Sequence, residues 1–170
     1  MPQPHPVLAD RGFYLGPLFR QAADRHGAVF VTLDRPLDVR PDLGVSLSYA
    51  VLAEVVENLS GRLWEAGVRP SEQVVVHKSD NVDIVLLTCA LSRIGAVPVL
   101  LSPALAGPVV GQLVGRLRQP WLITDRAKLD GPLKGVEITV RGTLSVDDAP
   151  GAEPLEKYAG AEPPAPVRLH

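Results

Sequence analysis

The sequence QVVVHKSDNVDIVLLTCALSRIGAVPVLLSP, residues 73–103, decides the fold class. Its three consecutive valines predict a strand over residues 73–77 that is covered on both faces. A segment that is apolar nearly all round predicts a buried helix over residues 82–94, and the run AVPVLL predicts a second buried strand over residues 96–101. A strand, a helix and a strand in this order are typical of a βαβ unit with parallel strands.

Cap and turn signals mark the ends of this unit. Asp80 or Asn81 can cap the amino terminus of the helix, and Gly95 is well placed to end it. Pro98 has no backbone N–H for a central ladder, so we expect a bulge or an unpaired edge at that point of the second strand. Cys89, the only cysteine, lies on the apolar helix without a neighbouring cation, which indicates an inert core residue and not a reactive thiol.

The same alternation extends along the chain in both directions. Ser48 can cap a long amphipathic helix that Gly67 ends, and a helix over residues 108–117 precedes a strand over residues 121–124. A fourth strand is predicted over residues 136–140. The repetition predicts right-handed βαβ units, and therefore an α/β fold with an open, mostly parallel sheet and flanking helices.

The sequence on either side of these βαβ units does not continue their alternation of strands and helices. Residues 15–27 predict a short helix with Gly27 as a left-handed cap, followed by a strand from Ala28. Residues 35–45 lack periodicity and predict an irregular surface excursion that joins two sheet regions. Proline-rich sequence begins near the carboxyl end. We therefore divide the chain into an amino-terminal α/β subdomain, residues 1–148, and a proline-rich linker toward a missing remainder, residues 149–170.

Length and charge exclude several classes of protein. The chain has 170 residues, of which 46% are hydrophobic, as expected for one domain with a real core. The formal charge of -2 comes from mixed signs without a basic run, so nucleic acid is not an expected partner. No stretch reaches about 18 uninterrupted apolar residues and no secretory signal pattern is present, so we expect a soluble cytoplasmic protein with no membrane partner.

Candidate site residues lie in the loops after the predicted strands, because open parallel sheets bind ligands beyond the carboxyl ends of their strands. His77 and Asn81 follow the first strand and Ser102 follows the second; these three are the candidates for the substrate side. The favoured alternative is a solvated helix entry that includes Lys78 and Asp80, and likewise an ordinary Ser-Pro turn at Ser102. No ligand-type residue stands at suitable spacing from His77, so no metal site is predicted.

Glycine recurs every fourth residue at Gly107, Gly111 and Gly115, which predicts a small helix face that another backbone can approach closely. Dinucleotide-binding, P-loop and nucleophile-elbow motifs do not occur in the sequence. The chain therefore contains no complete catalytic set, and no catalytic residue is predicted.

Residues 47–125 resemble the amino-terminal region of the adenylate-forming ligases, the superfamily of acyl- and aryl-CoA synthetases, nonribosomal peptide adenylation domains and luciferases. The resemblance rests on LSYAVLAEVVENLSGRLWEAGV, on the stretch quoted first and on PWLITD, which are similar to the family's first long helix, its strand–helix–strand unit and its next strand. Two places depart from the family pattern. Ser71 and Glu72 stand where many relatives have Gly-Asp, and SPALAGP replaces a more polar and basic segment.

The resemblance implies that a complete relative uses ATP and magnesium to adenylate a carboxylic acid, and then passes the acyl group to a thiol such as coenzyme A. The family's phosphate loop, rich in Ser, Thr and Gly and ending in Lys, has no counterpart in this sequence. Since adenylation needs cations and backbone donors on the phosphates, we expect the chain alone to bind no cofactor and to adenylate nothing. It would scaffold one wall of the acyl pocket, and the remainder of the ligase chain would supply the chemistry.

Two other classes stay open at this point. One is a stand-alone noncatalytic binding or assembly module derived from the same fold. The other is an unrelated Rossmann-like nucleotide binder, which has less support because the glycine-rich phosphate turn is missing. If the α/β subdomain is separated from its neighbours, exposed apolar surface predicts self-association into a homo-oligomer or reduced solubility.

Overall fold

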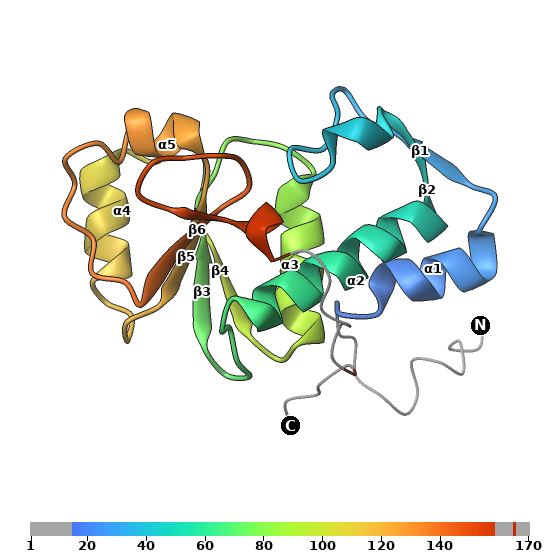
Figure 1. The fold of residues 1–170 in the computed structure, drawn as a ribbon, viewed down its shortest axis with the longest axis horizontal. Coiled ribbons are helices and arrows are strands. Elements are labelled where there is room, and N and C mark those ends of the chain that lie inside the picture. The colour runs from blue at the N-terminus through green and yellow to red at the C-terminus, as the bar shows by residue number, and fades with distance from the viewer. Residues whose placement is uncertain (1–14, 159–164, 166–170) are drawn as a thin grey trace, which may run out of the picture.

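The computed structural model describes residues 15–158 and residue 165. Its centre is a sheet of five parallel strands in the order β4-β3-β5-β6-β7 (Figure 1). The strands are β3 (Gln73–Val76), β4 (Val97–Leu100), β5 (Trp121–Thr124), β6 (Gly142–Ser145) and β7 (Glu153–Pro154). The predicted α/β fold with an open parallel sheet is confirmed.

Helices cover both faces of this sheet (Figure 1). The helices are α1 (Leu18–His26), α2 (Tyr49–Glu65), α3 (Asp83–Arg93), α4 (Gly107–Val114) and α5 (Arg126–Asp130). One apolar cluster joins α2 and α3 to Val74 and Val76, with α1 packed outside α2; a second cluster joins α4 to Val75 on the opposite face. Side chains alternate across a strand, so one run of valines supplies both layers. Among residues 15–158, none of the helices is long and apolar enough to cross a membrane.

The long helix α2 begins and ends as the sequence predicts. Ser48 Oγ accepts the backbone N–H of Val51 at 3.3 Å, and Gly67 has a φ of +105° directly after the helix. Gly95 likewise ends α3 with a φ of +77°. The left-handed cap predicted at Gly27 is wrong. Its φ is -57°, because the chain continues in a right-handed turn after α1 and does not reverse there.

The strand β4 forms one edge of the sheet. Pro98 pairs with Val74 in an unbroken register, so the unpaired edge predicted at the proline is present and the alternative of a bulge is wrong. The prediction that β4 is buried is also wrong, since Val97 and Leu100 are 39% and 51% exposed. The outer side of β4 has no neighbouring strand within the described residues.

The strand predicted over residues 136–140 is wrong, and the ladder begins later, in β6. Val136 packs against α4, and Ile138 and Val140 join the α4 cluster, so their alternating pattern reflects helix packing. Pairing begins where Gly142 lies opposite Trp121. A Cβ atom at Gly142 would lie 2.5 Å from Trp121 Cζ3, so only glycine fits against the indole ring.

The excursion over residues 35–45 lies between β1 (Phe30–Thr32) and β2 (Ser46–Ser48), which pair in an antiparallel sheet of their own. It is irregular, as predicted, with one short helical turn, η1 (Pro41–Leu43). It does not lie wholly on the surface, because Leu37 is 0% exposed and packs in the core.

The described part of the predicted linker packs against the domain. Residues 149–158 contain β7, which pairs with β6, and the turn η2 (Leu155–Lys157). Leu155 is only 2% exposed and joins the α2 cluster, and Tyr158 packs against the same cluster, so this stretch is docked on the domain. Apart from residue 165, the rest of the predicted linker lies outside the described residues, and the division of the chain at residue 148 stays a prediction.

The turn before β3 contains a strained residue. Glu72 N–H donates to the carbonyl of Arg69 at 3.2 Å, with Pro70 second and Ser71 third in the turn at a φ of +67°. A glycine adopts this conformation without a steric penalty, so Ser71→Gly should raise the free energy of unfolding by about 0.5–1 kcal/mol in urea denaturation. Ser92→Gly, inside α3, should lower it by about 0.5 kcal/mol. A loss of stability in both variants would contradict the strain at Ser71.

Candidate functional site

The carboxyl ends of β3, β4 and β5 define the candidate site. The chain passes from β3 through α3 to β4 at the edge, and then through α4 to β5 on the other side of β3. The chain enters α3 after β3 and α5 after β5, and these two helices pack on opposite faces of the sheet, so the two connections diverge between the neighbouring strands β3 and β5 (Figure 1). Such a topological switch point is where open α/β sheets bind ligands.

Lys78 lies two residues after the end of β3 and forms an ion pair with the excursion over residues 35–45. Its side chain is fully buried, and Nζ donates to Asp38 Oδ2 at 2.8 Å and to the carbonyl of Ser79 at 2.9 Å. Asp38 lies in the excursion, 40 residues earlier. A buried ammonium requires such partners, so Lys78 serves the loop geometry at this edge.

Asp83, the first residue of α3, accepts hydrogen bonds from the backbone of the same excursion. Its carboxylate accepts the backbone N–H of Asp38 at 3.0 Å through Oδ2 and that of Val39 at 3.0 Å through Oδ1. The side chain is 0% exposed. Buried backbone donors need acceptors, and this one carboxylate satisfies two of them. Sequence reasoning missed this role, although an acid in an otherwise apolar helix is a signal for a specific buried contact.

The amino-terminal cap of α3 differs from the prediction. Its cap residue is Val82, without a side-chain cap bond, so neither Asp80 nor Asn81 caps the helix. Asn81 Oδ1 accepts the N–H of Val82 at 2.6 Å, and Nδ2 donates to the carbonyl of Pro36 at 3.2 Å. These bonds favour a structural role for Asn81, and its contact with substrate stays a prediction.

His77 belongs to a buried polar row that crosses three strands. In the sheet register it lies beside Thr124, which is paired with Ser145. All three residues are 0% exposed. Within the described part of the chain, neither ring nitrogen of His77 and neither hydroxyl has a hydrogen-bond partner. The row faces the α5 side of the sheet, and sequence reasoning identified only its histidine.

The environment of His77 disfavours its charged form. Burial is the main cause that lowers its pKa from 6.5, and the positive charge of Lys128 adds to the effect. The backbone at Leu101 and Ser102 and the carboxylate of Asp125 act in the opposite direction without reversing it. His77 is therefore a neutral imidazole near neutral pH.

This lowered pKa makes stability depend on pH. The unfolded chain binds a proton at His77 below about pH 6.5, whereas the folded chain binds this proton only at a lower pH. The free energy of unfolding should thus fall as the pH decreases from 6.5 toward the lowered folded-state pKa. His77→Gln should flatten the profile of urea denaturation against pH, while His26→Gln, at an exposed position, should not. A flat wild-type profile between pH 7 and the onset of carboxylate titration near pH 5 would contradict this account.

The third candidate, Ser102, lies in an exposed turn after β4. Its Oγ accepts the N–H of Ala104 at 3.3 Å, as the turn interpretation of the sequence requires. Asp125, after β5, is the more central residue. Its Oδ2 accepts the N–H of Ser79 at 2.5 Å and its Oδ1 accepts that of Lys128 at 2.8 Å, which caps α5 and joins two of the loops. Substrate contact by Ser102 stays a prediction.

The two lysines near the candidate site each have a partner within this chain. Lys78 is paired with Asp38, and Lys128 Nζ donates to the carbonyl of Pro103 at 2.7 Å. Across residues 15–158, no group of three His, Cys, Asp or Glu residues could hold a metal ion. Cys89 is buried, which raises its pKa to about 11, and this agrees with the inert thiol predicted from the sequence.

Comparison with known proteins identifies the family. A profile of the family described as AMP-binding enzyme matches residues 18–169, and the chain belongs to this family. It is 48% identical over 171 residues to a 3-amino-2-hydroxy-4-methoxybenzoate diazotase of Streptomyces cremeus, covering 95% of this chain and 31% of the relative. It is 32% identical over 76 residues to a 4-chlorobenzoate–CoA ligase of Arthrobacter sp, covering 45% of this chain and 15% of that protein.

Solved structures agree with this assignment. A long-chain-fatty-acid–CoA ligase of Archaeoglobus fulgidus superposes with a TM-score of 0.72 at 20% identity, over 93% of this chain and 33% of that chain. A benzoate–CoA ligase of Burkholderia xenovorans gives 0.66 at 18% identity, over 94% and 31%. At this identity the likeness establishes the fold alone. The chain spans about a third of the length of the diazotase and of these ligases, and the predicted resemblance to adenylate-forming ligases is confirmed.

Proposed function

We propose that this chain is the amino-terminal part of an enzyme that adenylates its substrate with ATP, and that it supplies the scaffold and one wall of the pocket for an aromatic acid. The match to the AMP-binding family over residues 18–169 carries the proposal. The names of two relatives specify substituted benzoates, which supports an aromatic substrate. ATP and magnesium would be bound by the remainder of the protein, since this sequence has no phosphate loop rich in Ser, Thr and Gly that ends in Lys.

Two chemistries are candidates, and they differ in what is adenylated, the aromatic acid in one and nitrite in the other. Acid–thiol ligation would transfer the acyl group from AMP to coenzyme A, as the name of the Arthrobacter relative specifies for that protein. Diazotisation would convert an aryl amine into a diazonium group, for which adenylated nitrite is a chemically reasonable nitrosating agent. The amine displaces AMP from the nitroso nitrogen, and the product then loses water. The 48% identity over 95% of the chain favours diazotisation.

Product analysis of the native protein distinguishes these steps. The protein is incubated with ATP and magnesium, either with 4-chlorobenzoate and coenzyme A or with 3-amino-2-hydroxy-4-methoxybenzoate and nitrite. We expect pyrophosphate release in the second mixture, together with a diazonium product that couples to a phenol to form a dye. A thioester in the first mixture would establish acid–thiol ligation instead. Pyrophosphate release in neither mixture would count against adenylation of either compound, and therefore against both chemistries.

A further inference from the structure

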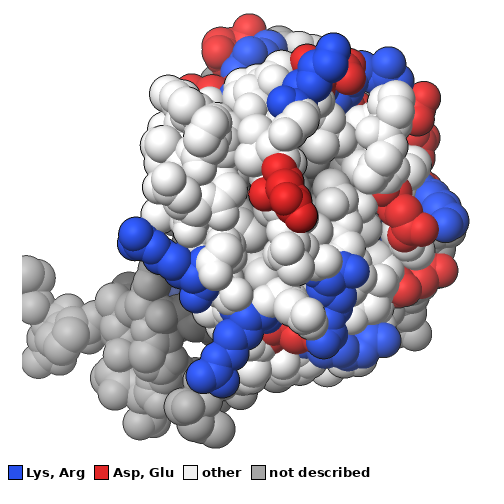
Figure 2. Space-filling model, turned by 90° about the vertical axis from the view of Figure 1, so that its left-hand side faces the viewer, with Lys and Arg blue, Asp and Glu red and all other residues white. Residues whose placement is uncertain are grey.

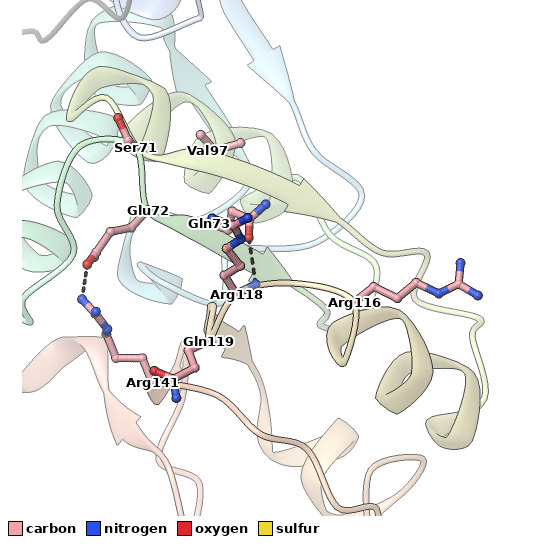
Figure 3. Close-up of a pocket in the computed structure, with 8 residues that line it drawn as sticks. All are labelled: Ser71, Glu72, Gln73, Val97, Arg116, Arg118, Gln119 and Arg141. Atoms are coloured by element: carbon pink, nitrogen blue, oxygen red, sulfur yellow. Dashed lines mark hydrogen bonds and ion pairs between the residues drawn. The ribbon is translucent and has the colours of Figure 1, made fainter.

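We propose that the amino edge of the sheet carries a second site, which binds a small molecule with a phosphate group. A cavity of about 550 Å³ opens there, between the amino ends of β3, β4, β5 and β6 (Figure 3). This volume lies within the range of small-molecule pockets, roughly 300–1,000 Å³. The cavity is at the opposite edge from His77 and Asp125, so it does not belong to the candidate substrate site.

The charges around this cavity favour an anion. Three arginines and one glutamate line it, in a chain whose formal charge is -2. The negative charge of the glutamate is already paired, because Glu72 forms an ion pair with Arg141. Its carboxylate also accepts the indole N–H of Trp121 at 3.0 Å and the backbone N–H of Arg69 at 2.9 Å. Within the described residues, the guanidinium groups of Arg116 and Arg118 form no ion pair.

The neutral groups of the cavity add further donors. Gln73 Oε1 accepts the backbone N–H of Arg118 at 3.3 Å, which leaves the Gln73 amide N–H groups free to donate. Figure 3 shows Gln73 and Arg118 side by side, while Arg116 extends outward from the end of α4. Arg118 is therefore the primary anion contact. A lining of guanidinium and amide donors suits the several acceptor oxygens of a phosphate.

Backbone strain is concentrated at the same place. In the part of the chain that the structure describes, two non-glycine residues have a positive φ, Ser71 at +67° and Gln119 at +45°, and both line this cavity. Each conformation costs about 1 kcal/mol that glycine would avoid. Strained backbone of this kind is typical of binding sites, where it holds particular side chains in place.

The molecular surface near the amino edge of the sheet is mainly basic. Figure 2 looks at the side of the molecule that carries α4, and Lys and Arg side chains predominate along its lower part, where the strands begin. Acidic side chains lie mainly toward the right and the top of this face. The field around the cavity would therefore attract an anionic ligand.

Titration of the 170-residue chain with inorganic pyrophosphate at low salt, followed by backbone NMR shifts and calorimetry, tests the proposal. We expect saturable binding of one pyrophosphate, with shifts centred on Gln73 and Arg118. Arg118→Ala should weaken the affinity at least tenfold, and Arg118→Lys, which keeps the charge and loses the guanidinium fork, should weaken it less. Arg126→Ala, at the carboxyl edge, is the matched control and should bind as the wild type does.

Three results would overturn this site. They are the absence of saturable pyrophosphate binding, an equal loss in the Arg118→Ala and Arg126→Ala variants, and equal affinity for citrate, which would indicate general attraction of anions. The spectra themselves report whether each variant is folded. Because the chain alone is not expected to adenylate, the outcome is independent of the proposed enzymatic activity.

Discussion

Replacing Gly107 with alanine should lower the free energy of unfolding by about 3 kcal/mol, the upper part of the range for overpacking a well-filled site. A Cβ atom at this position would lie 1.8 Å from the carbonyl oxygen of Pro132 and 2.7 Å from Cγ2 of Val136. The Pro132 oxygen belongs to the backbone and cannot rotate away. The turn after α5, residues 131–135, would therefore have to move away from α4. Urea denaturation followed by circular dichroism measures the change.

Gly111→Ala, one turn further along α4, is the matched control. Its Cβ atom would lie 3.2 Å from Cγ1 of Val136, which is a side-chain atom that can shift by a few tenths of an ångström. Alanine is also favoured over glycine inside a helix by about 1 kcal/mol. We expect the stability of this variant to lie within about 1 kcal/mol of the wild type. An equal loss in both variants would contradict the view that close approach is confined to Gly107.

Asp83→Ala should also lower the free energy of unfolding by about 3 kcal/mol. The substitution removes two charge-assisted hydrogen bonds and leaves the buried N–H groups of Asp38 and Val39 without an acceptor. It also frees the excursion, so the ion pair between Asp38 and Lys78 should become less ordered. Thermal and urea unfolding measure the loss, and hydrogen exchange at the Asp38 and Val39 amides should accelerate in the variant.

Asp80→Ala provides the comparison for this prediction, since it is the same change three residues earlier in the chain. Asp80 is exposed and makes no hydrogen bond or ion pair within the described residues. Its replacement should change stability by less than about 0.5 kcal/mol. Equal effects of the two substitutions would show that the loss at Asp83 comes from charge in general and not from its two backbone contacts.

The parts of the fold with a strong local pattern could be predicted from the sequence. Val74, Val75 and Val76 are all buried, and α2 has its apolar stripe, its cap at Ser48 and its end at Gly67 where the pattern places them. The strand β6 could not be predicted, because GTLS carries little strand propensity. Its place is decided by the fit of Gly142 under the indole of Trp121, which is a contact between distant residues.

The candidate site could be predicted from the sequence only in part, again because contacts between distant residues form it. His77 follows a recognisable strand, but Thr124 and Ser145 join it only through the sheet register. The pairing of Lys78 with Asp38 spans 40 residues and has no local signal. Leu155 shows the same limit in the tail, where it is buried in the core although composition alone assigns this proline-rich stretch to a linker.

The central claim is that this chain is part of a larger adenylate-forming enzyme, and ATP–pyrophosphate exchange tests it most directly. The assay compares the native protein from its source with the 170-residue chain, each with ATP, magnesium and a panel of substituted benzoates with and without nitrite, and the intact mass of the native protein is measured alongside. The account predicts a native species heavier than 18.2 kDa that catalyses exchange, and an isolated chain that does not. A native mass of 18.2 kDa without exchange would contradict it and favour a noncatalytic binding module.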